Sequence, residues 1–406
     1  FTPGTAGNLR TFTFSCWVKY TVFDNGASNQ PLLSGTNGST SMISFGQSSD
    51  TPHSMFVYNA GANIQTNALF RDSGGWYHVV VSFDTTQGTA SNRTKLYING
   101  VQVTSLATSN YPDQNADNSI NSTGLSYIGR QIGQSRYFDG YMAEVNQIDG
   151  LALGPDSFGE FKNDIWIPKD TAGLTFGDQG YRLQFKQTGT GTASSTTIGA
   201  DTSGNDNHWT SNSLVASDVT IDSPTNNFAT LNGAMRANMT LSEGNLSVVG
   251  VGNNYDNIAG TILFDATDSR GYYFEFRSSG NNDDSVSIGI STPENSDFNQ
   301  SDPAGSFTDD ALGFGYKGSG QKRNSDTNAS YGNSYTSGDI LSCAIKSGSI
   351  FFYKNGTIQN SGTAAYTSIA GTFVPASGLN GTHSGTFNFG QDSSFAGTET
   401  AQGNAD

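Results

Sequence analysis

The sequence contains one short phrase twice, an alternating segment that ends in Asn-Gly. Residues 95–101 form the first copy, with Asn99-Gly100, and residues 351–357 form the second, with Asn355-Gly356. An Asn-Gly pair readily adopts the positive φ angles of a two-residue hairpin turn between antiparallel strands. Each copy also follows another strand-like apolar run. The repetition therefore predicts two separate antiparallel β domains on one chain.

The composition of the 406-residue chain favours β structure throughout. Aromatic residues reach 12% although the hydrophobic fraction is only 34%, and fifty glycines supply turns. Only six of the 35 acidic residues are Glu, and Asp favours turns where Glu favours helices. The 26 Phe and 17 Tyr exclude a disordered Gly- and Ser-rich chain. We expect an all-β fold of two antiparallel β-sandwich (jelly-roll) domains in tandem.

The charge balance limits the partners of this chain. Its net charge is −16, and nucleic-acid binding is not expected because phosphate contacts need a basic face. No apolar run exceeds four residues, so no transmembrane helix and no membrane insertion are expected. The chain opens on Phe1 without a signal peptide, which predicts a fragment or a processed product. Cys16 and Cys343 fall in different predicted domains, so no disulfide between them and no zinc site are expected.

The first half of the chain is a series of predicted strands separated by turn residues. A short helix is expected near residues 158–161, after Gly154-Pro155-Asp156. The predicted strands span residues 11–19, 41–45, 55–58, 76–83, 95–101, 126–129 and 138–145. Spacings of this size are typical of a β sandwich. The series resembles the laminin-G-like, concanavalin-A-like sandwich, and the resemblance spans residues 1–215.

One departure from that resemblance concerns chain order. Many such domains begin with a strand followed by Asp-x-Ser-Gly-Asn-x-Asn, whereas here the equivalent segments, residues 181–185 and 201–209, come last. We therefore predict a permuted sandwich whose closing strands pair beside its opening ones. The prediction fails if Leu183 and Trp209 lie in a separate module.

The second half follows a turn-rich linker, predicted at residues 216–238, in which Pro224 would halt a strand ladder. Strands are predicted at residues 271–276, 286–290, 312–316, 330–332, 340–345, 351–356 and 387–391. This series resembles the SPRY domain, another β sandwich, over residues 239–398. Residues 399–406 are expected to be an incomplete tail. The tandem arrangement resembles virion proteins of tailed bacteriophages, especially marine ones, which implies a tail fibre, tail appendage or decoration protein.

Catalytic residues are not predicted. A glycosidase needs two carboxylates across a cleft, but Glu144 stands alone and Glu275 is followed by Phe276 and Arg277. The four histidines are His53, His78, His208 and His383, and none has the sequence context of a triad or a zincin. His78 lies within an aromatic and aliphatic strand, which indicates a packed residue rather than a base.

Calcium is the one metal considered, and no other cofactor is expected. Asp201, Asn205 and Asp206 lie within six residues and offer hard oxygen ligands. Asx-turn capping of a tight connection explains the same residues without a metal. No residue is therefore assigned as a catalytic, cofactor-binding or metal site.

Ligand-binding candidates are aromatic turn residues and loops. Sugar sites commonly combine an aromatic platform with amide and carboxylate groups, and four residues could provide one: Tyr111, Tyr137, Tyr255 and Phe298. The resemblance to SPRY domains, which bind partners through loops at one end, implies residues 281–284 and 321–324. Lys322 and Arg323 form a basic spot in the second loop, for which a solvated turn is the alternative.

The resemblances imply a non-enzymatic phage structural protein on the extracellular surface of the virion. Its expected partners are a host-surface glycan or receptor and other virion proteins, and a homo-oligomer is expected because weak sites gain avidity by multiplicity. Two alternatives remain open. One is a polysaccharide-degrading tailspike, and the other is a secreted bacterial adhesin built from the same folds.

Overall fold

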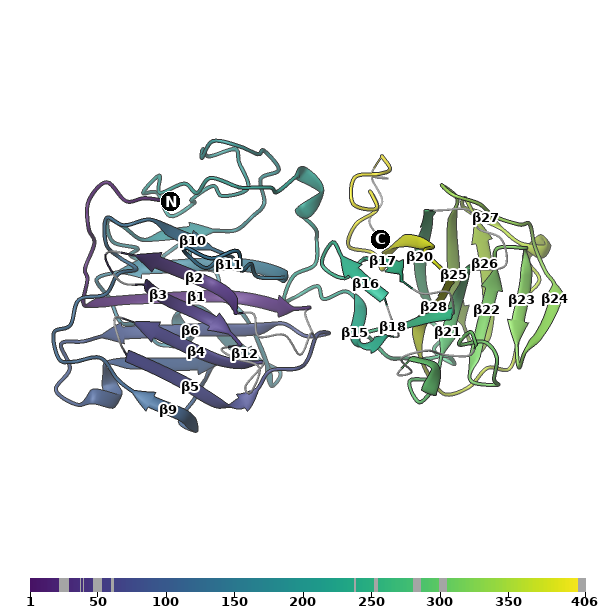
Figure 1. Ribbon diagram of the computed structural model, residues 1–406, viewed down its shortest axis with the longest axis horizontal. Helices are drawn as coiled ribbons and strands as arrows, with labels where there is room; N and C mark the ends of the chain where they lie inside the picture. The colour runs from purple at the N-terminus through teal and green to yellow at the C-terminus, as the bar shows by residue number, and fades with distance from the viewer. Residues whose placement is uncertain are drawn as a thin grey trace. The chain divides into compact units, whose positions relative to one another are not determined.

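The computed structural model contains two domains, which are described one by one (Figure 1). The first comprises Phe1–Val219 and Ser223–Asn227, and the second comprises Thr220–Asp222 and Phe228–Asp406. The structure describes residues 1–21, 29–36, 38, 40–46, 53–59, 62–236, 239–251, 255–279, 286–298 and 305–400. Its named strands pair antiparallel in every ladder, which confirms the prediction of an all-β fold of two antiparallel sandwiches.

The first domain consists of two sheets with one core between them. One sheet has the order β14-β11-β1-β6-β7-β8 and the other β10-β2-β3-β4-β5-β9, while β12 and β13 form a separate hairpin. The bounds are β1 Thr11–Tyr20, β2 Gln30–Thr36, β3 Thr40–Phe45, β4 Ser54–Asn59, β5 Ala62–Leu69, β6 Tyr77–Asp84, β7 Thr94–Ile98, β8 Val101–Gln102, β9 Leu106–Asn110, β10 Ser126–Ile128, β11 Gly140–Asp149, β12 Gly159–Lys162, β13 Ile165–Pro168 and β14 Tyr181–Leu183. Single 3-10 turns occur at Ala90–Asn92, Pro155–Ser157 and Ala216–Asp218.

Strand β1 lies inside its sheet and is buried on both faces. Phe12, Phe14 and Cys16 point into the core shared with the facing sheet, as the alternation of the sequence predicts. The opposite face of the sheet contributes Val80 and Ile148 to a second apolar cluster, which residues between β11 and β14 cover. The hairpin of β12 and β13 belongs to this covering segment.

The helix predicted near residues 158–161 is wrong. A 3-10 turn ends at Ser157, and β12 begins at Gly159. Asn163 and Asp164 have φ angles of 50° and 61°, which make a tight turn and pair Lys162 with Ile165. The turn therefore makes this segment a strand.

The closing segment of the first domain belongs to its sandwich, but it does not pair beside the opening strand as the permuted sandwich required. Leu183 pairs with Val145 of β11, and the Trp209 ring stacks on Phe1 with 5.2 Å between centroids. Both Leu183 and Trp209 lie in the main core of the domain. Strand β14 pairs with β11 rather than with β1, and residues 201–209 form a loop rather than a strand.

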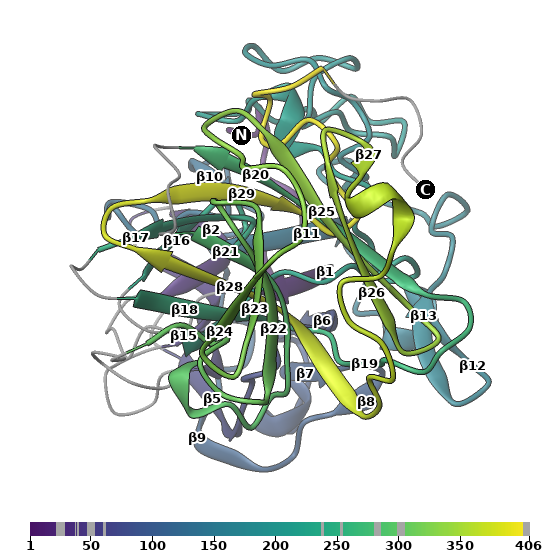
Figure 2. The same cartoon turned by 90° about the vertical axis from the view of Figure 1, so that its right-hand side faces the viewer.

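The second domain also packs two sheets on one core (Figure 2). One sheet has the order β15-β18-β28-β21-β22-β23-β24, with β19 also paired to β28, and the other has the order β16-β17-β29-β20-β25-β26-β27. The bounds are β15 Leu231–Arg236, β16 Met239–Ser242, β17 Ser247–Gly250, β18 Tyr255–Gly260, β19 Phe264–Asp265, β20 Tyr272–Ser279, β21 Val286–Ser291, β22 Gly313–Lys317, β23 Gln321–Asn324, β24 Thr327–Ser330, β25 Ile340–Lys346, β26 Ser349–Lys354, β27 Thr357–Ile358, β28 Thr372–Asn380 and β29 Ser384–Asn388. Single 3-10 turns occur at Ser296–Phe298 and Asn360–Gly362.

Strand β28 lies in the middle of its sheet although it contains Pro375, and the sequence analysis did not predict it. Proline lacks the N–H of a ladder bond and is rare in central strands. Here Ala376 pairs with Ala259 of β18, and Phe373 pairs with Phe264 of β19. On one side of β28, Pro375 lies between the last pair with β18 and the first pair with β19, and on the other side it pairs with Ile290 of β21.

Both cysteines are buried and free, one in the core of each domain, as predicted. Burial raises the pKa of the Cys16 and Cys343 thiols above its ordinary value. Within the described ranges, no helix has the length and apolar character of a membrane span.

Candidate functional site

A row of polar and aromatic side chains crosses the outer face of one sheet of the second domain. Strand β20 alternates, so that Phe274 and Phe276 enter the core while Tyr273 and Glu275 face outward. The strand register then sets Asn388 of β29, Glu275, Ser342 of β25 and Tyr353 of β26 side by side. We call these four residues and Tyr273 the outer row.

Hydrogen bonds fix the polar atoms of the outer row. Asn388 Nδ2 donates to Glu275 Oε2 at 3.0 Å, and the Tyr273 hydroxyl donates to Glu275 Oε1 at 2.7 Å. The same phenol oxygen lies 2.8 Å from Ser342 Oγ. Because a phenol has one proton and a carboxylate can only accept, the Ser342 hydroxyl is the donor of that bond. Both Glu275 oxygens are thus held by neighbours, and the carboxylate is oriented before any ligand arrives.

Aromatic surface lies beside these polar atoms. Tyr273 is 52% exposed, and its ring meets Tyr353 edge to face with 6.3 Å between centroids. Partial burial, followed by the neighbouring Glu275, raises the pKa of Tyr273 above its ordinary value, so the phenol stays protonated. Along the same strand, Arg277 Nε lies 2.6 Å from Glu399 Oε1 in an ion pair that borders the row. The arrangement presents one exposed ring, that of Tyr273, beside the half-buried Glu275 carboxylate, which the buried Asn388 amide orients.

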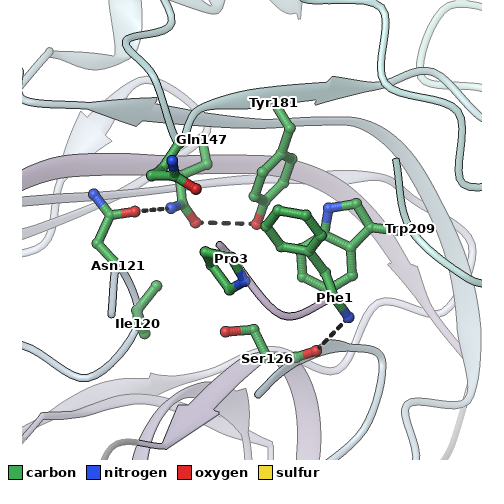
Figure 3. A pocket seen from close by; sticks show the side chains of 9 residues that line it. Phe1, Pro3, Ile120, Asn121, Ser126, Gln147, Tyr181 and Trp209 are labelled. Atoms are coloured by element: carbon green, nitrogen blue, oxygen red, sulfur yellow. Dashed lines mark hydrogen bonds between the residues drawn. The ribbon is translucent and has the colours of Figure 1, made fainter. Parts of the chain in front are cut away.

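Figure 3 shows a pocket of the first domain, where Phe1 and Tyr181 surround Trp209. The Tyr181 hydroxyl donates to Gln147 Oε1 at 3.0 Å, and Gln147 Nε2 donates to Asn121 Oδ1 at 2.6 Å. Its cavity volume of about 10 Å³ is far below the ~300–1,000 Å³ of common ligand pockets. Phe1 and Pro3 at the N-terminus line the pocket, and Tyr181, Gln147 and Asn121 form a chain of hydrogen bonds along it.

His78 is a packed residue, as predicted. It is fully buried, and its Nδ1 accepts a 2.9 Å hydrogen bond from Trp166 Nε1. An indole N–H can only donate, so the neutral ring carries its proton on Nε2, which lies 2.9 Å from Ser15 Oγ. Burial lowers the His78 pKa to about 3. A base that activates Ser15 would need a bare Nε2, and this ring has the opposite tautomer.

Glu144 lies at a bulge where β11 has one residue more than β1, and its φ is 47°. Its Oε2 lies 3.8 Å from Arg182 Nη2, which is also 2.9 Å from Asp170 Oδ1. The structure thus places a second carboxylate on the same arginine, which the sequence analysis did not foresee. Arg182 pairs with both acids, so the three residues form an ion-pair network.

The oxygen-rich loop of the first domain uses its ligand atoms internally. Asp201 accepts hydrogen bonds from the backbone N–H groups of Arg182, Ser203 and Asn207. Asn205 Nδ2 donates to the carbonyls at positions 177 and 180. These contacts are the Asx-turn capping that was weighed against calcium. In the described part of the chain, no group of three or more His, Cys, Asp or Glu side chains could hold a metal.

The predicted basic loop of the second domain is strand β23. Arg323 Nη2 is 2.6 Å from Asp309 Oδ1 and also bonds Asp326, while Lys322 Nζ lies 5.0 Å from the Tyr366 ring centroid. The segment is a strand rather than a solvated turn, and both basic side chains have intramolecular partners. The other predicted loop, residues 281–284, lies outside the described residues.

The four candidate aromatic residues do not form one site. Phe298 is fully buried, Tyr111 packs against the first core, and Tyr255 is half-buried at the start of β18. Tyr137 is 56% exposed and contacts Arg130. The sequence analysis missed the outer row because its members come from four strands. The signal available in the sequence was that polar residues alternate with core residues along these strands.

Comparison with protein-family models gives two matches. Residues 2–157 match the concanavalin A-like lectin/glucanases superfamily, and residues 271–392 match the SPRY domain. The chain carries a concanavalin A-like domain followed by a SPRY domain. Among solved structures, the SPRY domain of human HERC1 matches with 16% identity, over 39% of this chain and 96% of that chain, at a TM-score of 0.31. No curated protein matches the sequence of this chain.

Proposed function

We propose that the chain is a non-enzymatic binding protein of a tailed-bacteriophage particle, and that the outer row of its SPRY domain binds a host-surface glycan. The observation that carries the glycan part is the set of oriented polar atoms around Glu275, next to the exposed ring of Tyr273. Sugars offer hydroxyls to such donors and acceptors and apolar faces to such rings. The tandem order of the two domains supports a binding role.

Only Tyr273 of the row is exposed, while Ser342 and Asn388 are buried, so one site is expected to bind weakly. Affinity in such proteins grows when several sites engage one surface at once. We therefore place the chain in a homo-oligomer on the virion, where other virion proteins would hold it.

The glycan part is tested on an array of bacterial surface polysaccharides, probed with the wild-type protein and with Tyr273→Ala. We expect the substitution to lower binding at least tenfold, because it removes the ring and one hydrogen bond to Glu275. Tyr58→Ala is the matched control, since Tyr58 is an exposed tyrosine of the other domain. Equal binding by Tyr273→Ala and wild type would contradict the assignment of the outer row.

The virion part needs a different experiment. Antibodies against the chain, applied to intact particles and viewed by electron microscopy, should label tail appendages. Label over the capsid would favour decoration, and label on bacterial cells alone would favour a secreted adhesin. Release of new reducing ends from a bound polysaccharide would contradict the non-enzymatic part and favour a tailspike.

A further inference from the structure

Arg130 of the first domain has neighbours of a different kind from those of Arg182, Arg277 and Arg323. Arg182, Arg277 and Arg323 each lie within 4 Å of a carboxylate. The guanidinium carbon of Arg130 lies instead 4.8 Å from the Tyr127 ring centroid and 5.6 Å from that of Tyr137.

Within the described residues, the Nε donor of Arg130 is unused. Its Nε is buried, and among the described residues it has no hydrogen-bond partner. Within the same ranges, the guanidinium contacts the Tyr127 and Tyr137 rings. Guanidinium groups present a planar fork of donors that matches a carboxylate or sulfate group in two parallel hydrogen bonds.

The backbone around Arg130 is fixed. Arg130 forms an antiparallel bridge with Tyr137, and Gln131 N donates to the Arg136 carbonyl at 3.0 Å. Ser34 Oγ of β2 donates to the Arg130 carbonyl at 2.7 Å. We call residues 130–137 the arginine hairpin. Its contacts hold the arginine side chain at a constant place on the domain.

Charge along the sequence also distinguishes this region. Between Asp117 and Asp139 there is no acidic residue, while Arg130 and Arg136 are both present. The chain as a whole has a net charge of −16. Arg136 therefore places a second positive charge within the same hairpin.

We infer that the arginine hairpin binds an oxyanion of an acidic polysaccharide, a carboxylate or a sulfate group. Arg130 would form the paired hydrogen bonds, and the exposed Tyr137 ring would contact the adjoining sugar. This is a second site, in the other domain from the outer row. It extends the proposed glycan binding to charged polymers and does not depend on the outer row.

The test is electrophoresis of the whole chain in native gels that contain polygalacturonate, dextran sulfate or neutral dextran. We expect one or both acidic polymers to retard the wild-type protein and neutral dextran not to. Arg130→Gln should weaken retardation at least fivefold. Arg71→Gln, which removes an equal charge from an exposed site of the same domain, should not weaken it.

Retardation by polygalacturonate alone would identify a carboxylate, and retardation by dextran sulfate alone would identify a sulfate.

Tyr137→Leu separates binding from a folding defect, because it leaves the arginine in place and removes one ring. We expect it to weaken retardation by a smaller factor, with an unchanged melting temperature. Three results would overturn the inference: no retardation by either acidic polymer, equal retardation by neutral dextran, or equal losses in Arg71→Gln and Arg130→Gln. The array result for Tyr273→Ala, whether binding is lost or kept, does not affect the electrophoresis test. Arg71, Arg130 and Tyr137 lie in the first domain, and Tyr273 lies in the second.

Discussion

The two Asn-Gly hairpins have nearly the same backbone in both domains. Asn99 and Asn355 both have φ 49°, and the glycines that follow have φ 82° at Gly100 and 73° at Gly356. Positive φ at both central residues is the signature of a type I′ turn, whose twist matches that of the flanking strands. The repeated sequence phrase therefore encodes one repeated structure, as predicted.

The asparagine of each hairpin also closes the preceding strand. Asn99 N donates to the His78 carbonyl at 2.9 Å, and its Oδ1 accepts from His78 N at 2.7 Å. Asn355 makes the same two bonds with Ile340, at 2.7 and 2.8 Å. Each side chain thus replaces a ladder partner at the end of the neighbouring strand.

The surroundings of the hairpins differ. A Cβ on Gly100 would lie 2.7 Å from the Trp166 ring, whereas a Cβ on Gly356 would meet nothing within 4 Å. The residue bonded to the asparagine is the buried, titratable His78 in one domain and the apolar Ile340 in the other. The local sequence therefore determines the turn type, whereas the residues packed against the turn determine which substitutions it tolerates.

The largest expected effect is Gly100→Ala against Gly356→Ala. Both place a side chain at positive φ, which costs about 1–2 kcal/mol. At Gly100 the new methyl group also overlaps Trp166, and overpacking adds about 1–3 kcal/mol. We therefore expect Gly100→Ala to destabilise its domain by the larger amount.

Denaturant unfolding measures this difference in each domain. The four tryptophans all lie in the first domain, at positions 17, 76, 166 and 209. Their fluorescence follows that domain alone, and far-UV circular dichroism follows both. Equal shifts for the two variants would mean that Trp166 moves aside at little cost.

The second effect is a pH dependence that only the first hairpin should have. The folded pKa of His78 is about 3, below the ~6.5 of a free histidine. Between these values the unfolded chain binds a proton that the folded chain does not, so stability falls as pH falls. The slope is about 1.4 kcal/mol for each pH unit within that window.

A titration of unfolding between pH 7 and pH 4.5 checks this dependence, with tryptophan fluorescence as the probe. His78→Gln keeps hydrogen-bonding groups but cannot titrate, so it should remove most of the slope. In the second domain, the Arg270 guanidinium holds the pKa of Asp268 below its usual range. The stability that the charged Asp268 contributes is therefore lost only below about pH 4. An unchanged slope in His78→Gln would assign the effect to other groups.

Sequence patterns predicted the hairpins and most central strands because their information is local. Alternation identified β1 and β20, and Asn-Gly identified two turns. Strand β28 was missed because proline is rare in central strands. On one side of β28 the partner strand changes near Pro375, and only the strand pairing shows this.

The candidate site was less predictable than the fold. Tyr273 and Asn388 are 115 residues apart, and the register of β20 with β25 and β29 brings the members of the outer row together. Arg130 was not singled out, because an arginine without a carboxylate is recognised only when its neighbours are known. Tyr137 was proposed as an exposed aromatic residue, and the structure adds its contact with Arg130.

The smallest expected effect separates the two asparagines themselves. Asn→Asp keeps the Oδ1 acceptor of the backbone bond at both turns. Asn355 Nδ2 additionally donates to Asp339 Oδ1 at 2.8 Å, and Lys354 Nζ lies 3.0 Å from the same carboxylate. Asn355→Asp therefore exchanges a hydrogen bond for two facing carboxylates, and we expect a loss of about 1 kcal/mol at pH 7.

Asn99→Asp should cost less, because its backbone bond to His78 N persists and the described structure gives Nδ2 no carboxylate partner. The difference should shrink below about pH 4, where protonation removes the repulsion between positions 339 and 355. Salt should shrink it in part, since Asn355 is exposed while Asp339 is half-buried. If both variants lose the same stability at every pH and salt concentration, the asparagine matters only through its backbone bonds, and the two hairpins are equivalent at this position.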